Sequence, residues 1–188
     1  MSPSSRANVL FSRPESEALS DAERTTPVSP SQDSLPAFTG LQVHHDARLG
    51  FSVLVPDGWQ RLDADVAFFA PNADDPLTGL AIEGRDLGTE VRPADLATLR
   101  RGFLRGLRQL PGSRIESREA EVVGRLITLE ARHTFRDGDA VRKRWIRLLY
   151  QGRIQVRLIA QAASVEDFDY WEPMFFTAVR TARFGTFV

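Results

Sequence analysis

Apolar and polar residues alternate along the second half of the chain, from residue 125 to residue 162. This period of two is typical of β-strands with one buried face and one solvent-exposed face. Asp137-Gly138 and Gln151-Gly152 interrupt it as turns, which divides it into strands at residues 125–136, 141–150 and 153–162. The apolar residues expected to point inward are Ile127, Leu129, Ala131, Phe135, Ile154, Val156, Leu158 and Ala160. The pattern predicts an antiparallel meander.

Shorter apolar segments precede the meander. Residues 50–55 predict a strand that ends at the turn Pro56-Asp57-Gly58, and residues 66–70 and 77–83 predict two more strands. Trp59 follows the turn directly, so we expect its side chain to be buried where the chain turns back over the sheet.

Two other segments have helical spacing. Pro93 opens the first at a preferred first-turn position, and Pro111-Gly112 ends it. Its apolar stripe consists of Leu96, Leu99, Phe103, Leu104 and Leu107. Ser164 is the predicted N-cap of the second segment, with Asp167 three residues later. The inner face of this segment consists of Phe168, Trp171, Phe175 and Val179, and Pro173 predicts a kink or a break into two short helices.

These elements predict an α+β domain at residues 38–188, an antiparallel sheet with helices packed on its covered face. Residues 184–188 add a final edge strand to this prediction.

The first 37 residues differ from the rest of the chain. They are rich in Ser, Pro, Glu and Asp and have no apolar period, so they predict an arm that is disordered unless a partner orders it. Val9, Leu10 and Phe11 are adjacent within this arm and are a candidate anchor for a partner's groove. The alternative is that these three apolar residues are adjacent by chance and bind nothing.

Composition narrows the function classes. The chain has 24 basic and 25 acidic residues, so its net charge of −1 favours neither a nucleic acid nor a membrane surface as partner. Cysteine is absent, which excludes disulfides and thiolate chemistry. We find no signal-peptide pattern at the N-terminus and no apolar run near the roughly 20 residues of a membrane span, so we expect a cytoplasmic protein without membrane insertion.

Arginine dominates the basic residues, and Lys143 is the only lysine. Several arginines fall on neighbouring strands of the meander, where alternate side chains lie within reach of one another on the open sheet face. The candidates for binding an acidic protein partner are Arg132, Arg142, Arg144, Arg153 and Arg157. The alternative is that these arginines lie on a solvent-exposed sheet face, where acidic residues neutralise part of their charge.

No residue set predicts catalysis. His44-His45-Asp46 is the densest cluster of metal-ligand types, but adjacent histidines on a strand point to opposite faces. His133 falls on the apolar side of its strand, which is typical of a core histidine. We therefore expect a protein that is not an enzyme and has no cofactor and no metal.

The segment Gly50-Phe51-Ser52-Val53-Leu54-Val55-Pro56-Asp57-Gly58-Trp59 resembles the opening motif of the PsbP-like and DcrB-like superfamily, and the order of elements over residues 41–188 is similar to it. The resemblance implies an α+β sandwich and a non-enzymatic role: an accessory subunit of a photosynthetic complex, a lipoprotein, or a chaperone or adaptor for secretion effectors. The sequence lacks the signal peptide and lipobox cysteine of exported members, which favours an intracellular partner. A small-ligand carrier that uses a cavity between sheet and helices is the alternative.

Overall fold

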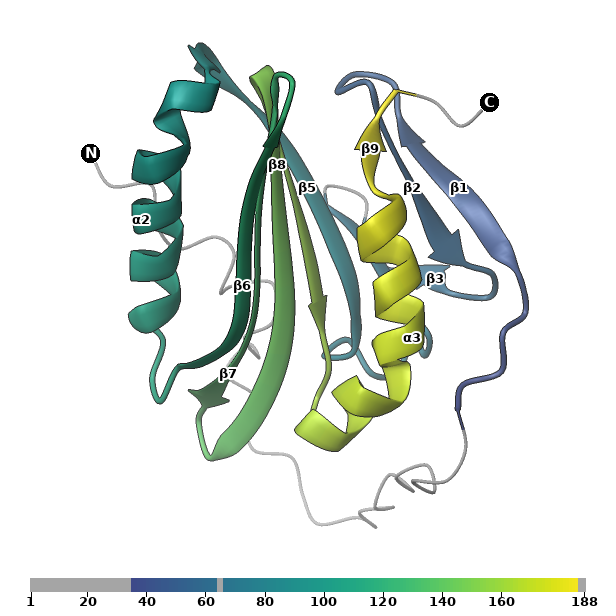
Figure 1. Cartoon of the computed structure of the whole chain (residues 1–188). Helices are drawn as coiled ribbons and strands as arrows, with labels where there is room; N and C mark the ends of the chain where they lie inside the picture. The colour runs from purple at the N-terminus through teal and green to yellow at the C-terminus, as the bar shows by residue number, and fades with distance from the viewer. Residues whose placement is uncertain (1–34, 64–65, 186–188) are drawn as a thin grey trace, which may run out of the picture.

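A computed structural model describes residues 35–63 and 66–185 and arranges them in layers (Figure 1). The central layer is a six-stranded antiparallel sheet. Its strands, in spatial order, are β3 (Gln60–Arg61), β4 (Ala67–Ala70), β5 (Gly79–Val91), β8 (Ala140–Gln161), β7 (Leu126–Asp137) and β6 (Arg114–Val123). The predicted α+β class is confirmed.

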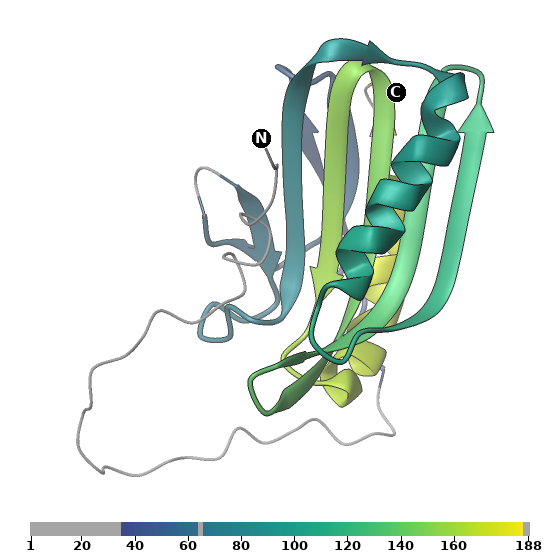
Figure 2. The same cartoon turned by 90° about the vertical axis from the view of Figure 1, so that its left-hand side faces the viewer.

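A helix lies on each side of this sheet. The short 3-10 helix η1 (Pro93–Asp95) leads into α2 (Leu96–Arg108), which lies over β6 and β7 on one face (Figure 2). The opposite face is covered by α3 (Val165–Thr181) and by a small sheet of β1 (Leu41–Asp46), β2 (Phe51–Pro56) and β9 (Arg183–Phe184). The expectation of helices on one face only is therefore wrong.

The long element β8 doubles back on itself. Its first part, up to Tyr150, pairs with β7, and its second part, from Gly152, pairs with β5. Arg144 contacts Gln161, 17 residues along the chain, and Figure 2 shows the reversal between the two arms. Gly152 has a φ of 60°, a backbone angle that glycine adopts without strain, so the predicted turn at Gln151-Gly152 is confirmed.

The apolar residues predicted to face one way divide between two cores. Ile127, Leu129 and Ala131 pack with Leu104 and Leu107 of α2. Val156, Leu158 and Ala160 instead point to the opposite side, toward α3 and β2. α2 packs over β6 and β7 on one face, and α3 and β2 pack on the other, so different elements bury the two faces of the sheet.

The second core lies between the two sheets and α3. Trp59 is 7% exposed, and its ring makes edge contacts with Trp171 and Phe175 of α3. Phe51, Val53 and Val55 of β2 are fully buried in the same core. The predicted burial of Trp59 is confirmed.

The predicted cap of α3 is present. The prediction at Pro173 was a kink or a break, and the helix is not broken there. The Oγ of Ser164 accepts a hydrogen bond from the backbone amide of Asp167 at 3.0 Å. Pro173 lies inside a helix that continues through Thr181. Met174 and Phe175, directly after the proline, are buried in the core, and this packing holds the two halves of the helix together.

Candidate functional site

The five predicted partner-binding arginines lie on two faces of the central sheet. Residues opposite each other in a pair of strands share a face, and Arg132 lies opposite Trp145 whereas Arg144 lies opposite His133. Arg132 therefore faces α3. Arg142, Arg144 and Arg157 share the face that carries α2, so the expectation of one open face for the set is wrong.

On the α2 side, two of these arginines are buried. Arg142 is 8% exposed and Arg144 is 3% exposed. Arg142 lies 2.8 Å from a carboxylate oxygen of Asp137, and Arg144 donates to the amide oxygen of Gln161. Burial, followed by the charges of Arg157 and Arg142, lowers the pKa of Arg144 to about 10. Arg142 and Arg144 are therefore buried in this arrangement, and their role in partner binding stays a prediction.

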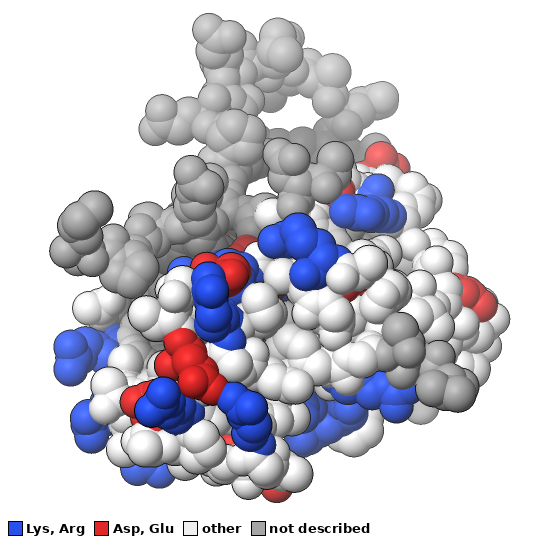
Figure 3. Space-filling model, turned by 90° about the horizontal axis from the view of Figure 1, so that it is seen from above, with Lys and Arg blue, Asp and Glu red and all other residues white. Residues whose placement is uncertain are grey.

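The other two arginines are more accessible. Arg157 pairs with Glu83 across β5 and β8 and keeps 29% of its side chain exposed. Arg153 pairs with Asp86 at 3.0 Å, and 57% of its side chain is exposed. Figure 3, a view from above, likewise shows basic and acidic groups lying next to one another. The role of these arginines in partner binding stays a prediction, as does that of Val9, Leu10 and Phe11, which lie outside the described residues.

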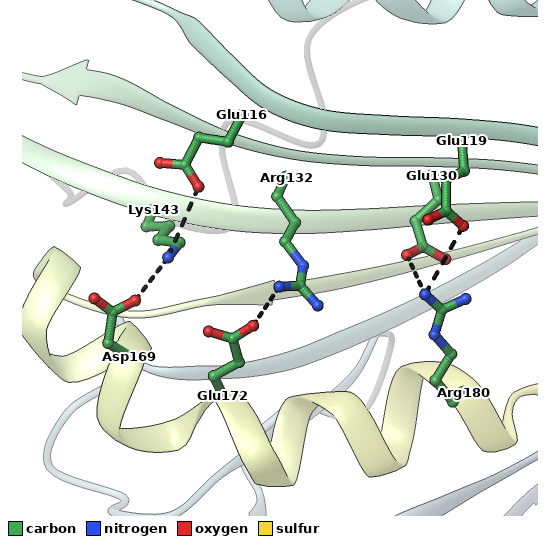
Figure 4. Close-up of polar contacts among 8 residues, drawn as sticks. All are labelled: Glu116, Glu119, Glu130, Arg132, Lys143, Asp169, Glu172 and Arg180. Atoms are coloured by element: carbon green, nitrogen blue, oxygen red, sulfur yellow. Dashed lines mark hydrogen bonds and ion pairs between the residues drawn. The ribbon is translucent and has the colours of Figure 1, made fainter.

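The α3 side carries a row of ion pairs, which we call the α3 seam. Lys143 lies 2.7 Å from Asp169 and 3.7 Å from Glu116, and Arg132 pairs with Glu172 (Figure 4). Arg180 lies 3.2 Å from Glu130 and 3.8 Å from Glu119. These pairs join α3 to β6, β7 and β8.

The carboxylates of the α3 seam stabilise the protonated form of Lys143. Burial alone lowers its pKa, but the hydrogen bond and charge of Asp169, together with Glu116 and Glu172, outweigh burial and raise the pKa overall. Lys143 therefore stays protonated at neutral pH.

Aromatic rings lie within the seam. Trp145 is fully buried, and the guanidinium of Arg132 stacks over it at 3.9 Å. Phe176 of α3 lies 6.0 Å from Trp145 but is 49% exposed, and the guanidinium of Arg180 is 5.7 Å from its ring. We call Arg132, Glu172, Phe176 and Arg180 the α3 surface.

The sequence carried a signal for this surface that the strand pattern did not reveal. Glu172, Phe176 and Arg180 are spaced by four residues, so they fall along one stripe of α3. The inner stripe is already filled by Phe168, Phe175 and Val179, which leaves Phe176 on the outside.

His133 is a core residue, as the sequence predicts. It is fully buried next to Phe135, and within the described residues neither ring nitrogen has a hydrogen-bond partner. Burial, then the charge of Arg144, lowers its pKa to about 4, and the backbone of Thr134 offsets these effects only in part.

Replacement of His133 by leucine is expected to reduce the acid sensitivity of the fold. The unfolded chain takes up a proton near the ordinary histidine pKa of 6.5, whereas the folded protein resists protonation down to about 4. Stability from this residue is therefore complete above pH 6.5 and declines as the pH falls, by about 2 kcal/mol at pH 5. Denaturant unfolding of both proteins at pH 7 and pH 5 measures the difference, and parallel losses would contradict the assignment.

The two histidines near the end of β1 point to opposite sides of the strand. His44 faces inward and contacts the ring of Phe69, whereas His45 lies on the other side and hydrogen-bonds Ser52 through Nδ1 at 2.8 Å. Ser52 in turn donates to the backbone oxygen of Gly185. Across residues 35–63 and 66–185, no three His, Asp or Glu side chains are grouped so as to hold a metal ion.

Comparison with known proteins identifies the fold. No protein-family model matches the chain, and no curated protein matches it either. The solution structure of cyanobacterial PsbP (CyanoP) from Synechocystis sp. PCC 6803 is similar over 82% of this chain and 99% of that one, with a TM-score of 0.54 and 13% identity. LpqN of Mycobacterium tuberculosis, described as involved in cell envelope biogenesis, is similar over 78% of this chain and 91% of its own, with a TM-score of 0.53 and 14% identity.

At this level of identity the likeness shows a shared fold alone. Within the part of the chain that the structure describes, no helix is both long and apolar enough to span a bilayer.

Proposed function

We propose that this chain, which has the PsbP-like fold, is a protein-binding accessory subunit, adaptor or chaperone of a larger assembly and is not an enzyme. The observation that carries the proposal is the half-exposed ring of Phe176, held on α3 among Arg132, Glu172 and Arg180. The similar structures support the PsbP-like fold, and the proposed role rests on the chemistry of the α3 surface.

The chemistry of the α3 surface suits a protein partner. Aromatic residues and arginines dominate the energetic centres of protein interfaces, and a rim of polar groups shields such centres from water. The surrounding charges are already paired: Arg132 with Glu172, and Arg180 with Glu130. A partner can therefore bury the ring of Phe176 in an apolar pocket without having to neutralise an isolated charge.

Arg153, Arg157 and the segment Val9, Leu10 and Phe11 extend this proposal as secondary contacts. The two arginines keep exposed side chains that an acidic partner surface can approach. A cytoplasmic location, in a secretion-type or photosynthetic-type assembly, stays a prediction from the sequence.

Phe176→Ala is expected to weaken partner binding by about 30-fold, which corresponds to about 2 kcal/mol for an aromatic anchor. The partner is first recovered by affinity purification of the full chain from its native host and then titrated as a purified protein. Val141→Ala is the matched control, because Val141 is 48% exposed and lies outside the α3 surface. Equal affinities of the two variants would contradict the proposed site, provided that both melt near the native temperature.

A further inference from the structure

The outward side of α2 carries charge of one sign. From residue 96 to residue 115 the chain contains five arginines and no acidic residue, although its net charge as a whole is −1. Four of the five belong to α2, which Figure 2 shows on the outside of the central sheet. Their side chains are all exposed: Arg100, Arg101, Arg105 and Arg108. The outer side of this helix is therefore locally basic within a nearly neutral protein.

Three of these arginines form one stripe. Arg101, Arg105 and Arg108 are spaced by four and three residues, so their side chains are neighbours along one side of α2. Arg118 of β6 is exposed on the same face of the sheet, since it lies opposite Ala131, which packs in the core beneath α2. We call Arg101, Arg105, Arg108 and Arg118 the α2 surface.

The charges of the α2 surface are not neutralised by the domain itself. Among the residues that the structure describes, none of its four guanidinium groups forms an ion pair, and Arg101 donates a hydrogen bond to the hydroxyl of Thr98 at 3.0 Å. Asp95, the acid directly before α2, already accepts a hydrogen bond from the backbone amide of Arg92 at 2.9 Å. Like charges three and four residues apart reduce helix stability, and an acidic ligand removes this repulsion.

The needs of the helix itself do not account for the stripe. Arg105 and Arg108 in the last turn complement the partial negative charge of the C-terminus of α2. Arg101 lies in the middle of the helix and Arg118 lies on a strand, so neither gains from this effect.

Two glycines lie beside the stripe without a reason in the fold. A Cβ added to Gly102 or Gly106 meets no atom of the described residues within 4 Å. Glycine is less favourable than alanine inside a helix, so these positions cost stability where the fold has room for a side chain. Glycine is typical of places where the backbone of a ligand approaches closely.

The rest of α2 disfavours a bilayer or a nucleic acid as the ligand. Leu104 and Leu107 of its apolar stripe are buried in the core against β6 and β7, so they are not available to insert among lipids. Phe103, its one aromatic residue, packs on the same core and is not available to stack on bases. Guanidinium groups bind carboxylates through paired hydrogen bonds.

We propose that the α2 surface binds an acidic segment of a protein partner, with aspartate or glutamate side chains that meet Arg101, Arg105 and Arg108. At a rise of about 1.5 Å per residue the stripe is about 10 Å long, which roughly four residues of an extended chain can follow. This assignment rests on the proposed protein-binding role and adds the charge of a partner. The α2 and α3 surfaces share no residue and lie on opposite faces of the sheet, so each can be tested separately.

The test titrates the full chain into a fluorescein-labelled oligoglutamate peptide and follows fluorescence anisotropy. We expect saturable binding that weakens as the salt concentration rises. Arg101→Glu combined with Arg105→Glu should weaken it roughly tenfold or more. Arg48→Glu combined with Arg153→Glu is the matched control, because it changes the net charge equally at side chains that are 70% and 57% exposed outside the α2 surface. The control should change the affinity by less than about twofold.

Two further variants make the result decisive. Arg101→Gln combined with Arg105→Gln should also weaken binding, and it replaces the charge reversal if circular dichroism shows that the reversal unfolds α2. Phe176→Ala should leave peptide affinity unchanged, so failure of the α3 surface to bind a partner is distinguishable from failure here. Equal affinities of the α2 variants and the control, or loss of peptide binding in Phe176→Ala, would overturn the proposal.

Other ligands of the same arginines give different outcomes. Binding of phosphatidylserine vesicles or single-stranded DNA through Arg101 and Arg105, with no binding of the peptide, would assign a different ligand and overturn the proposal. Neutralisation of the acids at residues 15, 17, 21 and 23 to Gln or Asn should leave peptide affinity unchanged. A clear gain in affinity would show that the chain's own N-terminal segment occupies the surface, which would overturn the proposal as well.

Discussion

Replacement of Trp59 by alanine is expected to lower the free energy of unfolding by about 3–5 kcal/mol, the cost of removing a buried aromatic side chain. Trp59 is 7% exposed and lies between the turn at Gly58 and the inner face of α3. Its ring centroid is 5.7 Å from that of Trp171 and 5.8 Å from that of Phe175. The variant therefore leaves a cavity where β2, the turn and α3 meet.

Chemical denaturation at neutral pH measures this loss. Trp59→Phe is a suitable control because it retains an aromatic ring, and it should cost clearly less than the alanine variant. A loss below about 1 kcal/mol for Trp59→Ala would show that this junction is not part of the cooperative core.

Glu130→Ala is expected to cost a similar amount, about 3–5 kcal/mol, for an electrostatic reason. The side chain of Glu130 is 7% exposed and lies 3.2 Å from Arg180 and 3.8 Å from Arg147. Burial lowers the pKa of Arg147, and Glu130 is the strongest influence in the opposite direction. Removal of the carboxylate leaves the charge of Arg147 buried beneath α3.

Two comparisons test this explanation. Glu130→Leu combined with Arg147→Met should restore most of the lost stability, since both charges are then absent from the interior. Arg153→Ala breaks an exposed pair with Asp86 and should leave stability nearly unchanged. If the double replacement is as unstable as Glu130→Ala, the loss comes from packing and not from the isolated charge.

Local signals in the sequence predicted much of the fold. The turns at Asp137-Gly138 and Gln151-Gly152, the helix after Pro93 and the cap at Ser164 each depend on a few neighbouring residues, and all of them are present. The strand β6 was missed because its sequence, RIESREAEVV, is dominated by charged and exposed residues. An edge strand of this kind has little apolar alternation to reveal it.

Alternation of apolar and polar residues separates the two sides of a strand, but it does not show which layer of the fold lies against each side. The apolar residues Leu129 and Leu158 were assigned to one interior, yet they face α2 and α3 respectively, because both faces are covered. For the same reason Arg132 and Arg144 were predicted to share one face, although the pairing of β7 with β8 puts them on opposite faces of the sheet.

Binding of a protein partner over Phe176 can be tested by photo-crosslinking in the native host. A benzophenone amino acid replaces Phe176 in the full chain, and the same group at Val141 controls for an equally exposed apolar position elsewhere. If the partner binds over Phe176, position 176 should crosslink to a defined peptide of one protein, and position 141 should give no such product. No crosslink at 176, or the same products from both positions, would contradict it.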